Sequence, residues 1–540
     1  MIRLLAAAFS ILFILNGYSL FLSKIFPYFV PVINIVILLL TVFITLLRSP
    51  LHAFILVYIP VRAILPKILL FNIGGLPDFN MHQNVMIIIF LSHIIFTLYK
   101  ANFQKWKPRM IDFVFIGFYA CYAISVTLND GLWEMQSRLR VRVLDELLVY
   151  FLARAAIEGP KMRQLFLKTL VYTHLVLIPF FLLDFRFGYE FINSFFNAPI
   201  LDAELRWGFV RVKGVYGHPI ITGIIYGQIY VIYNWFRMNY DFDEFTPKLK
   251  VFYAFCLPIL GFLLIWVPTR IAISKFFATL FTIFNAMAFF ILLFIFLFNI
   301  HGSMDKNRRF RFLSFIFTKE FFAPINLLLL LGLFSTISRG PWVSTIFFMY
   351  IAWVGLMRGK VKKAAVIFLF IICGYIPFKM YEIKARTEGT AGTYRHLMRT
   401  VWYRDILLYE TGWFGVGILD AKYVQNRYGI GLSRRSIDDA ALHLEFHHGR
   451  IIVYFYNLFF IVGWYYCLFI LFKTPSQSIE RSLAFLFAGS IAFMFNALHN
   501  VWLSPEAAYF LFLILGWQSG LVGELKNPNY VFEDRRYVTK

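Results

Sequence analysis

Charged side chains are scarce in this chain: only 15% of its 540 residues are Asp, Glu, Lys or Arg. Soluble domains average about 25% charged and about 45–50% apolar residues. Here 60% of the residues are hydrophobic and the mean hydropathy is +0.70. Too few polar residues remain to cover a soluble globular surface of this size. The composition therefore excludes a soluble protein and predicts a chain that lies in a bilayer.

The charge that is present is mostly positive, with 52 Lys and Arg against 29 Asp and Glu and a net charge of +23. Nucleic-acid binding is one possible reason for such an excess. A multispanning membrane protein, however, concentrates Lys and Arg in its cytoplasmic loops. We therefore expect membrane lipids, and no nucleic acid, among the partners of this chain.

Cysteine pairs and nucleotide-binding motifs are also missing. The sequence contains no Walker A, G-x-G-x-x-G or G-x-S-x-G motif, which disfavours ATP-driven transport and soluble-nucleotide chemistry. The cysteines form no C-x-x-C pair, so neither a disulfide framework nor a zinc site is predicted. They lie singly in apolar stretches, at Cys121, Cys256, Cys373 and Cys467.

Long hydrophobic runs are what the chain has instead. A transmembrane helix needs about 20 apolar residues, and we predict an all-α integral membrane protein with roughly 14–16 such helices. The weakest candidates are 51–70, which contains two prolines, and 143–157, which contains two acidic residues. The expected spans are 4–22, 29–47, 51–70, 84–99, 111–128, 143–157, 165–184, 215–236, 250–268, 275–300, 324–338, 341–357, 363–379, 451–472, 482–498 and 505–523.

Four clusters of basic residues set the predicted orientation. They begin at Lys100, Arg154, Lys306 and Arg358, and an even number of predicted spans separates each from the next. Because Lys and Arg are retained on the cytoplasmic side, we place these clusters and both termini in the cytoplasm. Three arginines at 138, 140 and 142 run against this rule. The segments expected to face outward are 185–214, 338–341, 380–450 and 499–504.

The outward segment 380–450 is the only long polar interruption of the hydrophobic pattern. Loops of more than about 12–15 residues are usually functional or disordered, and the aromatic residues of this one argue against disorder. We expect short helices packed on the membrane domain, with 436–448 leading into the next span. The chain thus divides into N-terminal spans (1–200), central spans with Arg-rich outer ends (201–379), the large loop (380–450), and C-terminal spans with a short cytoplasmic tail (451–540).

Several arginines fall at the predicted outer ends of spans or in this loop. Arg339 lies between two apolar runs with almost no loop, where a charge is costly and tends to be functional. Arg211 precedes a span, and Arg395 and Arg399 would share one helix face. Guanidinium groups bind phosphate oxygens through two parallel hydrogen bonds. The set predicts a pyrophosphate site, although each arginine alone also fits a snorkelling or solvated surface residue.

Acidic and imidazole side chains cluster at the end of the large loop. Asp438, His443 and His448 are candidates for a general base that takes the proton from an attacking hydroxyl. His443 and His447 are four residues apart, which also suits a metal pair, but there is no H-E-x-x-H arrangement and no third ligand. We therefore expect neither a metal nor another cofactor. Interfacial histidines that cap the next span remain the alternative.

The order of these features along the chain is typical of one family. From about residue 206 to 523, the order of its motifs and their positions relative to the spans resemble the O-antigen ligase/O-antigen polymerase superfamily of integral membrane glycosyltransferases. The features are Arg211 leading through Gly214 to His218-Pro219, the Ser338-Arg339-Gly340 turn, Tyr394-Arg395 before Trp402, the segment Gly412–Gly417 (GWFGVG), and Gly449 ahead of a span with Gly463.

The resemblance implies a metal-independent, GT-C-like enzyme of the bacterial inner membrane. Such enzymes take a glycan from an undecaprenyl-pyrophosphate donor and pass it to a glycan acceptor hydroxyl on the outer face, and polysaccharide-assembly proteins are possible partners. By this resemblance Arg339 and Arg395 would hold the donor pyrophosphate, with Arg211 lining the same cavity.

One departure from the family pattern concerns the end of the large loop. Ligases carry a His-Asn pair there, whereas in this chain the family register falls near Asp438 and the dipeptide His499-Asn500 occurs only one span from the end. This favours a polymerase over a ligase and leaves the base open among Asp438, His443 and His448, with His443 favoured. From a different class, a flippase or transporter of lipid-linked sugars stays as an alternative, although no internal repeat is evident.

Overall fold

The computed structural model describes residues 26–65, 70–71, 79–99, 107–157, 159–187, 205–206, 209–240, 324–355, 409–418, 440–498 and 504–533. Most of these residues are helical, so the all-α prediction is confirmed at that level. The exceptions are two antiparallel pairs of two-residue strands. They join β1 (Leu70–Phe71) to β2 (Phe79–Asn80) and β3 (Leu205–Arg206) to β4 (Phe209–Val210).

Three of the described helical segments depart from α geometry. η1 and η3 are π-helical and η4 is a 3-10 turn. In chain order the helices are α3 (Phe26–Leu47), α4 (Pro50–Ala53), η1 (Phe54–Tyr58), α5 (Ile59–Ile64), α6 (Met81–Tyr99), α7 (Met110–Asp130), α8 (Leu132–Arg142), η3 (Val143–Leu147), α9 (Leu148–Ala156), α10 (Pro160–Phe187), η4 (Gly214–Tyr216), α12 (Pro219–Asn239), α16 (Pro324–Ser335), α17 (Arg339–Val354), α21 (Ala440–His448), α22 (Arg450–Lys473), α23 (Ile479–Leu498) and α24 (Pro505–Glu524).

Within the described residues, five helices are long and apolar enough to cross a membrane: α6, α7, α22, α23 and α24. Shorter apolar helices lie at 34–47, 50–64 and 340–354. These apolar helices support the prediction of a membrane protein. The predicted spans 4–22, 250–268, 275–300 and 363–379 lie outside the described residues.

The predicted span 51–70 is wrong at its C-terminal end. The helix expected over 51–70 ends at Ile64, and Leu65 has an extended backbone (φ −89°, ψ 131°). Leu65 precedes Pro66, whose ring disfavours helical geometry in the residue before it. The other proline, Pro60, is accommodated because it lies in the first turn of α5, directly after the π-helical turn η1.

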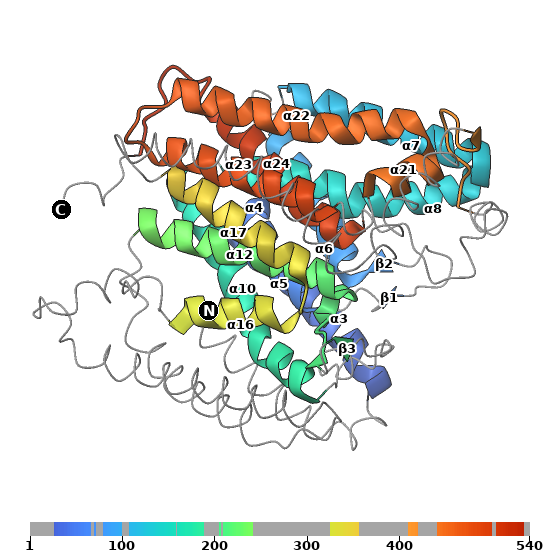
Figure 1. Ribbon diagram of the computed structural model, residues 1–540, viewed down its shortest axis with the longest axis horizontal. Coiled ribbons are helices and arrows are strands. Elements are labelled where there is room, and N and C mark those ends of the chain that lie inside the picture. Colours follow the sequence, from blue (N-terminus) through green and yellow to red (C-terminus); the bar gives the residue numbers. More distant parts are fainter. Residues whose placement is uncertain are drawn as a thin grey trace, which may run out of the picture.

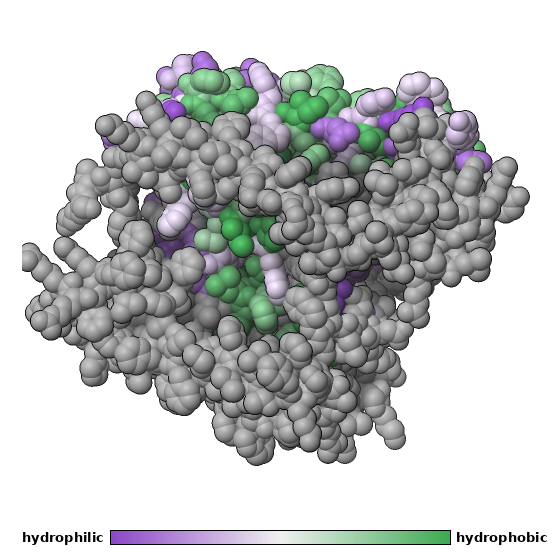
Figure 2. All heavy atoms as spheres, viewed as in Figure 1, coloured by the Kyte–Doolittle hydropathy of each residue, from purple (hydrophilic) through white to green (hydrophobic). Residues whose placement is uncertain are grey.

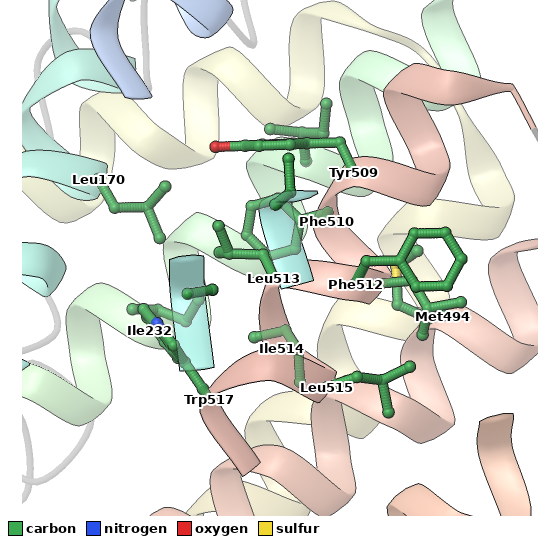
Figure 3. Packing of buried hydrophobic residues seen from close by; sticks show 14 of the residues in the cluster. Leu170, Ile232, Met494, Tyr509, Phe510, Phe512, Leu513, Ile514, Leu515 and Trp517 are labelled. Atoms are coloured by element: carbon green, nitrogen blue, oxygen red, sulfur yellow. The ribbon is translucent and has the colours of Figure 1, made fainter. Parts of the chain in front are cut away.

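α24 forms the centre of the bundle. Nearly every side chain between Ala507 and Val522 is buried, and Figure 3 shows its large apolar side chains pointing in several directions, toward Leu170 of α10, Ile232 of α12 and Met494 of α23. On the side of α9, Gly516 allows close approach, since a Cβ there would lie 2.6 Å from the Tyr150 carbonyl oxygen. Small residues permit this kind of packing between membrane helices.

The helices define two ends of the bundle, which we name by the residues Arg211 and Arg163. α12, α17, α22 and α24 begin at the Arg211 end, and α23 runs antiparallel to α17 beside them (Figure 1). Asn496 at the end of α23 donates to Ser344 near the start of α17, over 2.6 Å. The Arg163 end holds the starts of α10 and α23 and the end of α24, where Arg163 pairs with Glu480 and Glu524.

Apolar side chains remain on the outside of the outer helices. Ile461, Leu468 and Phe472 of α22 and Phe113 and Ile116 of α7 are exposed. In Figure 2 patches of hydrophobic residues alternate with hydrophilic ones along the upper edge, which in Figure 1 is the position of α22. Exposed apolar faces on helices of this length are what a lipid environment requires.

Candidate functional site

Arg211 contacts the turn that precedes Arg339. Its Nη2 donates to Ser338 Oγ over 3.0 Å and its Nε donates to the Thr336 carbonyl over 3.3 Å. The neighbouring backbone adds a hydrogen bond from the Val212 amide to the Ser335 carbonyl, over 3.1 Å. Two basic segments that are far apart in the sequence are thus joined at the Arg211 end.

The turn itself explains why Arg339 starts a helix. Ile337 has a positive φ of 45°, which few non-glycine residues adopt, and the extended backbone of Ser338 forms the N-cap of α17 without a side-chain capping bond. α17 therefore begins at Arg339, two residues before Pro341. The backbone of Arg339 is at the Arg211 end, whereas its side chain is outside the described part of the chain.

The residues after Arg211 have structural roles that the sequence pattern alone did not show. Lys213 is buried, and its carbonyl accepts the Thr222 hydroxyl over 2.5 Å. Gly214 has φ 54°, and a Cβ there would lie 2.6 Å from the Phe181 ring, so only glycine fits. His218 Nδ1 accepts the Ile220 amide at the start of α12. The segment is therefore held between α10, α12 and the turn before α17.

The histidines of α21 lie together, also at the Arg211 end. The rings of His443 and His447 have centroids 4.3 Å apart, and the His448 ring lies 4.5 Å from that of Tyr122 in α7. His448 Nδ1 is 3.4 Å from Ser125 Oγ. The prediction of a helix leading into the next span is confirmed over 440–448. Phe446 packs inward as expected, but the buried face also includes His447 and His448 rather than Leu442.

Burial governs the protonation of these imidazoles. It lowers the pKa of His443 to about 3, and His447 and Arg142 add to the effect. The pKa of His448 is lowered well below its usual value, first by burial and then by Arg142. At neutral pH each ring is therefore uncharged, which is the form that can accept a proton. Basicity is correspondingly weak, because a good general base has a pKa near the working pH.

The Gly412–Gly417 segment packs directly on α21. The Val416 amide donates to the Phe446 carbonyl and the Gly417 amide to the His447 carbonyl, each over 3.0 Å. His447 Nδ1 donates in return to the Gly417 carbonyl over 3.2 Å. Two parts of the large loop that were predicted separately from the sequence are thus parts of one unit.

The remaining predicted site residues are not placed. Arg395, Arg399 and Asp438 lie outside the described residues, as does most of the 380–450 loop. The described site residues form two groups at the same end of the bundle: Arg211 contacts the turn before α17, while α21 packs on α7. In the described part of the chain, no group of three His, Cys, Asp or Glu side chains is arranged to hold a metal ion.

An ionic cluster beside α21 was not predicted from the sequence. Glu146 is fully buried and accepts hydrogen bonds from Arg142 Nη1 over 2.9 Å and from the Tyr119 hydroxyl over 3.0 Å. Arg138 pairs with Asp130 over 2.7 Å. The arginines at 138, 140 and 142 could have indicated this cluster, because they lie on the predicted outer side, where few Lys and Arg are expected. All three lie in α8, where Arg138 and Arg142 pair with carboxylates and the Arg140 guanidinium lies over the Phe79 ring.

A second ionic cluster includes the other acidic residue of the π-helical turn η3. His82 Nε2 lies 3.1 Å from Arg62 Nη1 and 3.2 Å from Asp145 Oδ1. Gln83 Nε2 donates to Asp145 Oδ2 over 3.4 Å. These side chains are buried among membrane helices, and π-helical turns frequently occur at functional sites. Asp145 and Glu146 made 143–157 a weak span candidate because their partners could not be seen in the sequence.

Comparison with known proteins found no match to a family model, a curated protein or a solved structure.

Proposed function

We propose that this chain is a membrane glycosyltransferase of GT-C-like architecture. It would act as a polysaccharide polymerase that passes a glycan from an undecaprenyl-pyrophosphate donor to an acceptor sugar hydroxyl at the outer face of a bacterial inner membrane. The observation that carries the proposal is the contact of Arg211 with Ser338. It brings a basic segment next to the turn that leads into Arg339, as a site for a lipid-linked pyrophosphate requires.

The chemistry of the basic residues supports an anionic donor. Arginine at membrane depth is costly unless it is paired or bound to a ligand, and its planar fork matches phosphate oxygens. The buried Lys213 adds a further positive charge within the same segment. A pyrophosphate leaving group gains negative charge as the sugar departs, so fixed cations would lower the barrier most in the transition state.

The proton of the attacking hydroxyl needs an acceptor, and α21 supplies candidates. His443 and His448 are uncharged at neutral pH because of their burial. Backbone hydrogen bonds to the Gly412–Gly417 segment fix the helix that carries them. Because arginines would neutralise the negative charge of the donor pyrophosphate, the proposed reaction needs no metal ion.

Two other functions fit parts of the structure. A ligase would use the same donor site with another acceptor, such as a lipid A core. A flippase or transporter of lipid-linked sugars is favoured by the buried Arg62–His82–Asp145 cluster, because buried ionisable residues often mark transport pathways. Only a polymerase lengthens the glycan on the lipid.

The test uses the full chain in proteoliposomes with a radiolabelled oligosaccharide on undecaprenyl pyrophosphate. We expect ladders of longer lipid-linked glycan, formed equally well in EDTA. Arg211→Lys keeps the charge but loses the fork, so turnover should fall about 100-fold. Arg481→Lys is the matched control, because that side chain lies at the other end and bonds to the Thr474 carbonyl.

The outcomes separate the candidates. Transbilayer movement of the donor without lengthening would favour the transporter, and transfer only to an added lipid A core would favour the ligase. Full turnover of the Arg211→Lys protein, or loss of turnover in EDTA, would contradict the proposed donor site.

A further inference from the structure

The Arg62–His82–Asp145 cluster joins three separate parts of the chain inside the membrane domain. Arg62 belongs to α5, His82 starts α6, and Asp145 lies in η3 (Figure 1). His82 is 1% exposed, Asp145 is fully buried and Arg62 is 6% exposed. Ionisable groups at this depth are costly and therefore need a reason beyond packing.

No single protonation state of His82 Nε2 suits both of its neighbours, because one is a hydrogen-bond donor and the other an acceptor. A ring nitrogen either carries a hydrogen and donates, or carries a lone pair and accepts. Arg62 Nη1, 3.1 Å away, is always a donor, whereas an ionised Asp145 Oδ1, 3.2 Å away, is always an acceptor. An Nε2 without a hydrogen can accept from Arg62, but its lone pair repels Asp145. A protonated Nε2 can pair with Asp145 but opposes Arg62.

The surroundings give the Arg62 guanidinium a second position and hold Asp145 in place. Arg62 Nη2 is buried and has no hydrogen-bond partner among the described residues, and it lies 4.0 Å from Glu506 Oε1 at the start of α24. The Arg62 guanidinium also lies over the Tyr509 ring, 5.6 Å from its centroid, which supports the charge in either position. Asp145 is held from its other oxygen by Gln83, which in turn accepts the Asn80 amide.

We propose that Arg62, His82, Asp145 and Glu506 form a proton-binding switch in the membrane domain. Without the proton, His82 Nε2 accepts from Arg62. When a proton from water binds Nε2, the new N–H donates to Asp145, and the guanidinium turns to Glu506. The switch couples α5 and α6 to the start of the central helix α24. It does not depend on the proposed transferase activity.

The groups that face this switch come from every element packed around it. They are Tyr58 of η1, Gln83 of α6, Tyr216 of η4, and Glu506 and Tyr509 of α24. Of these, only Glu506 carries a charge at neutral pH and lies close enough to receive Arg62. Only His82 therefore gains or loses a proton in the switch, and Arg62 stays charged in both states.

The test is solid-state NMR of the protein in lipid bilayers, with ¹⁵N in the rings of its 11 histidines. The His82 signal is assigned by its loss in His82→Gln, and His93→Gln on the same helix α6 is the matched control. As the pH falls from about 9 to about 5, we expect the His82 Nε2 signal to change from that of an unprotonated to that of a protonated nitrogen, while Nδ1 stays protonated.

Two variants test the movement of Arg62. Glu506→Gln removes the second position of the guanidinium, so the change should need a pH lower by about one unit or more. Arg62→Gln removes the cation beside the imidazole, so the change should occur at higher pH. A His82 Nε2 that keeps one state over the whole pH range would overturn the switch. A change unaffected by Glu506→Gln would overturn the transfer of Arg62 to Glu506.

Discussion

The backbone amide of Gly417 donates to the carbonyl of His447 over 3.0 Å, although the two residues are 30 positions apart in the large loop. The same pairing places Gly415 against the backbone of His447, and Gly449 against that of Trp413. The orientation of the α21 histidines thus depends on glycines that lie outside their helix.

Replacing Gly415 should separate these two parts of the loop. Gly415→Ala adds a Cβ that collides with the His447 carbonyl, in a residue whose φ is already 77°. We expect a loss of about 2–4 kcal/mol in local stability, seen as faster hydrogen exchange of the α21 amides by mass spectrometry.

Gly412→Ala is the control for backbone strain alone, since its φ is 54° but no atom lies within 4 Å of the new Cβ. It should cost about 1 kcal/mol. Equal exchange in both variants would contradict the packing argument.

Loss of the general base should lower turnover without weakening donor binding. We expect one of Asp438→Asn, His443→Ala or His448→Ala to reduce turnover by about 10²–10⁴-fold, measured as glycan transfer at saturating donor. If His443 is the base, its pKa of about 3 keeps it in the proton-accepting form at all higher pH. Turnover should then persist to below about pH 5, because an exposed histidine would instead lose function near pH 6.5. Three fully active variants would leave the mechanism without its base.

The same pKa predicts how stability depends on pH. The folded protein holds His443 unprotonated at pH values where the unfolded chain, with an ordinary histidine pKa near 6.5, binds a proton. Stability is therefore lost as the pH falls below about 6.5. His443→Gln should reduce this loss in thermal unfolding followed at pH 7 and pH 5. An identical pH dependence in both proteins would count against the burial of His443.

Arg163 should be essential for stability at its end of the bundle. Its guanidinium contacts Glu524 and Glu533 at 3.1 Å and Glu480 at 3.6 Å, and its side chain is 1% exposed. Arg163→Gln leaves these carboxylates without their cation, so we expect a loss of about 3–5 kcal/mol in chemical unfolding. Lys161→Gln, a change at an exposed position of the same helical turn, should alter stability by less than about 0.5 kcal/mol. An effect of Arg163→Gln as small as that of Lys161→Gln would contradict a stabilising role for this cluster.

The predicted orientation can be measured by labelling single cysteines in intact cells. In a chain whose four cysteines are replaced by serine, we expect an impermeant maleimide to label Asp420→Cys but not Lys360→Cys. The basic clusters motivate this result, since Lys and Arg stay in the cytoplasm. The opposite pattern would reverse the membrane orientation and remove the site from the outer face.

Sequence periodicity located most described helices because an apolar run of about 20 residues matches the thickness of a bilayer when it is helical. The start of α22 and the end of α7 fall within two residues of the predicted limits. Where the limits were wrong, backbone chemistry decided: Pro66 ended the helix expected over 51–70, and the turn at Gly214–Gly217 delayed α12 until Pro219. Such local effects act within a few residues and are averaged out in a hydropathy window.

Composition and hydropathy along the chain were sufficient to predict a mostly helical chain with long apolar helices. The contact of Arg211 with Ser338 could not be predicted in this way, nor could the burial of Asp145 and Glu146 beside Arg62, His82 and Arg142. These arrangements come from the tertiary structure. A charge inside a membrane is tolerated only with a partner, and helix packing brings together partners that are far apart in the sequence.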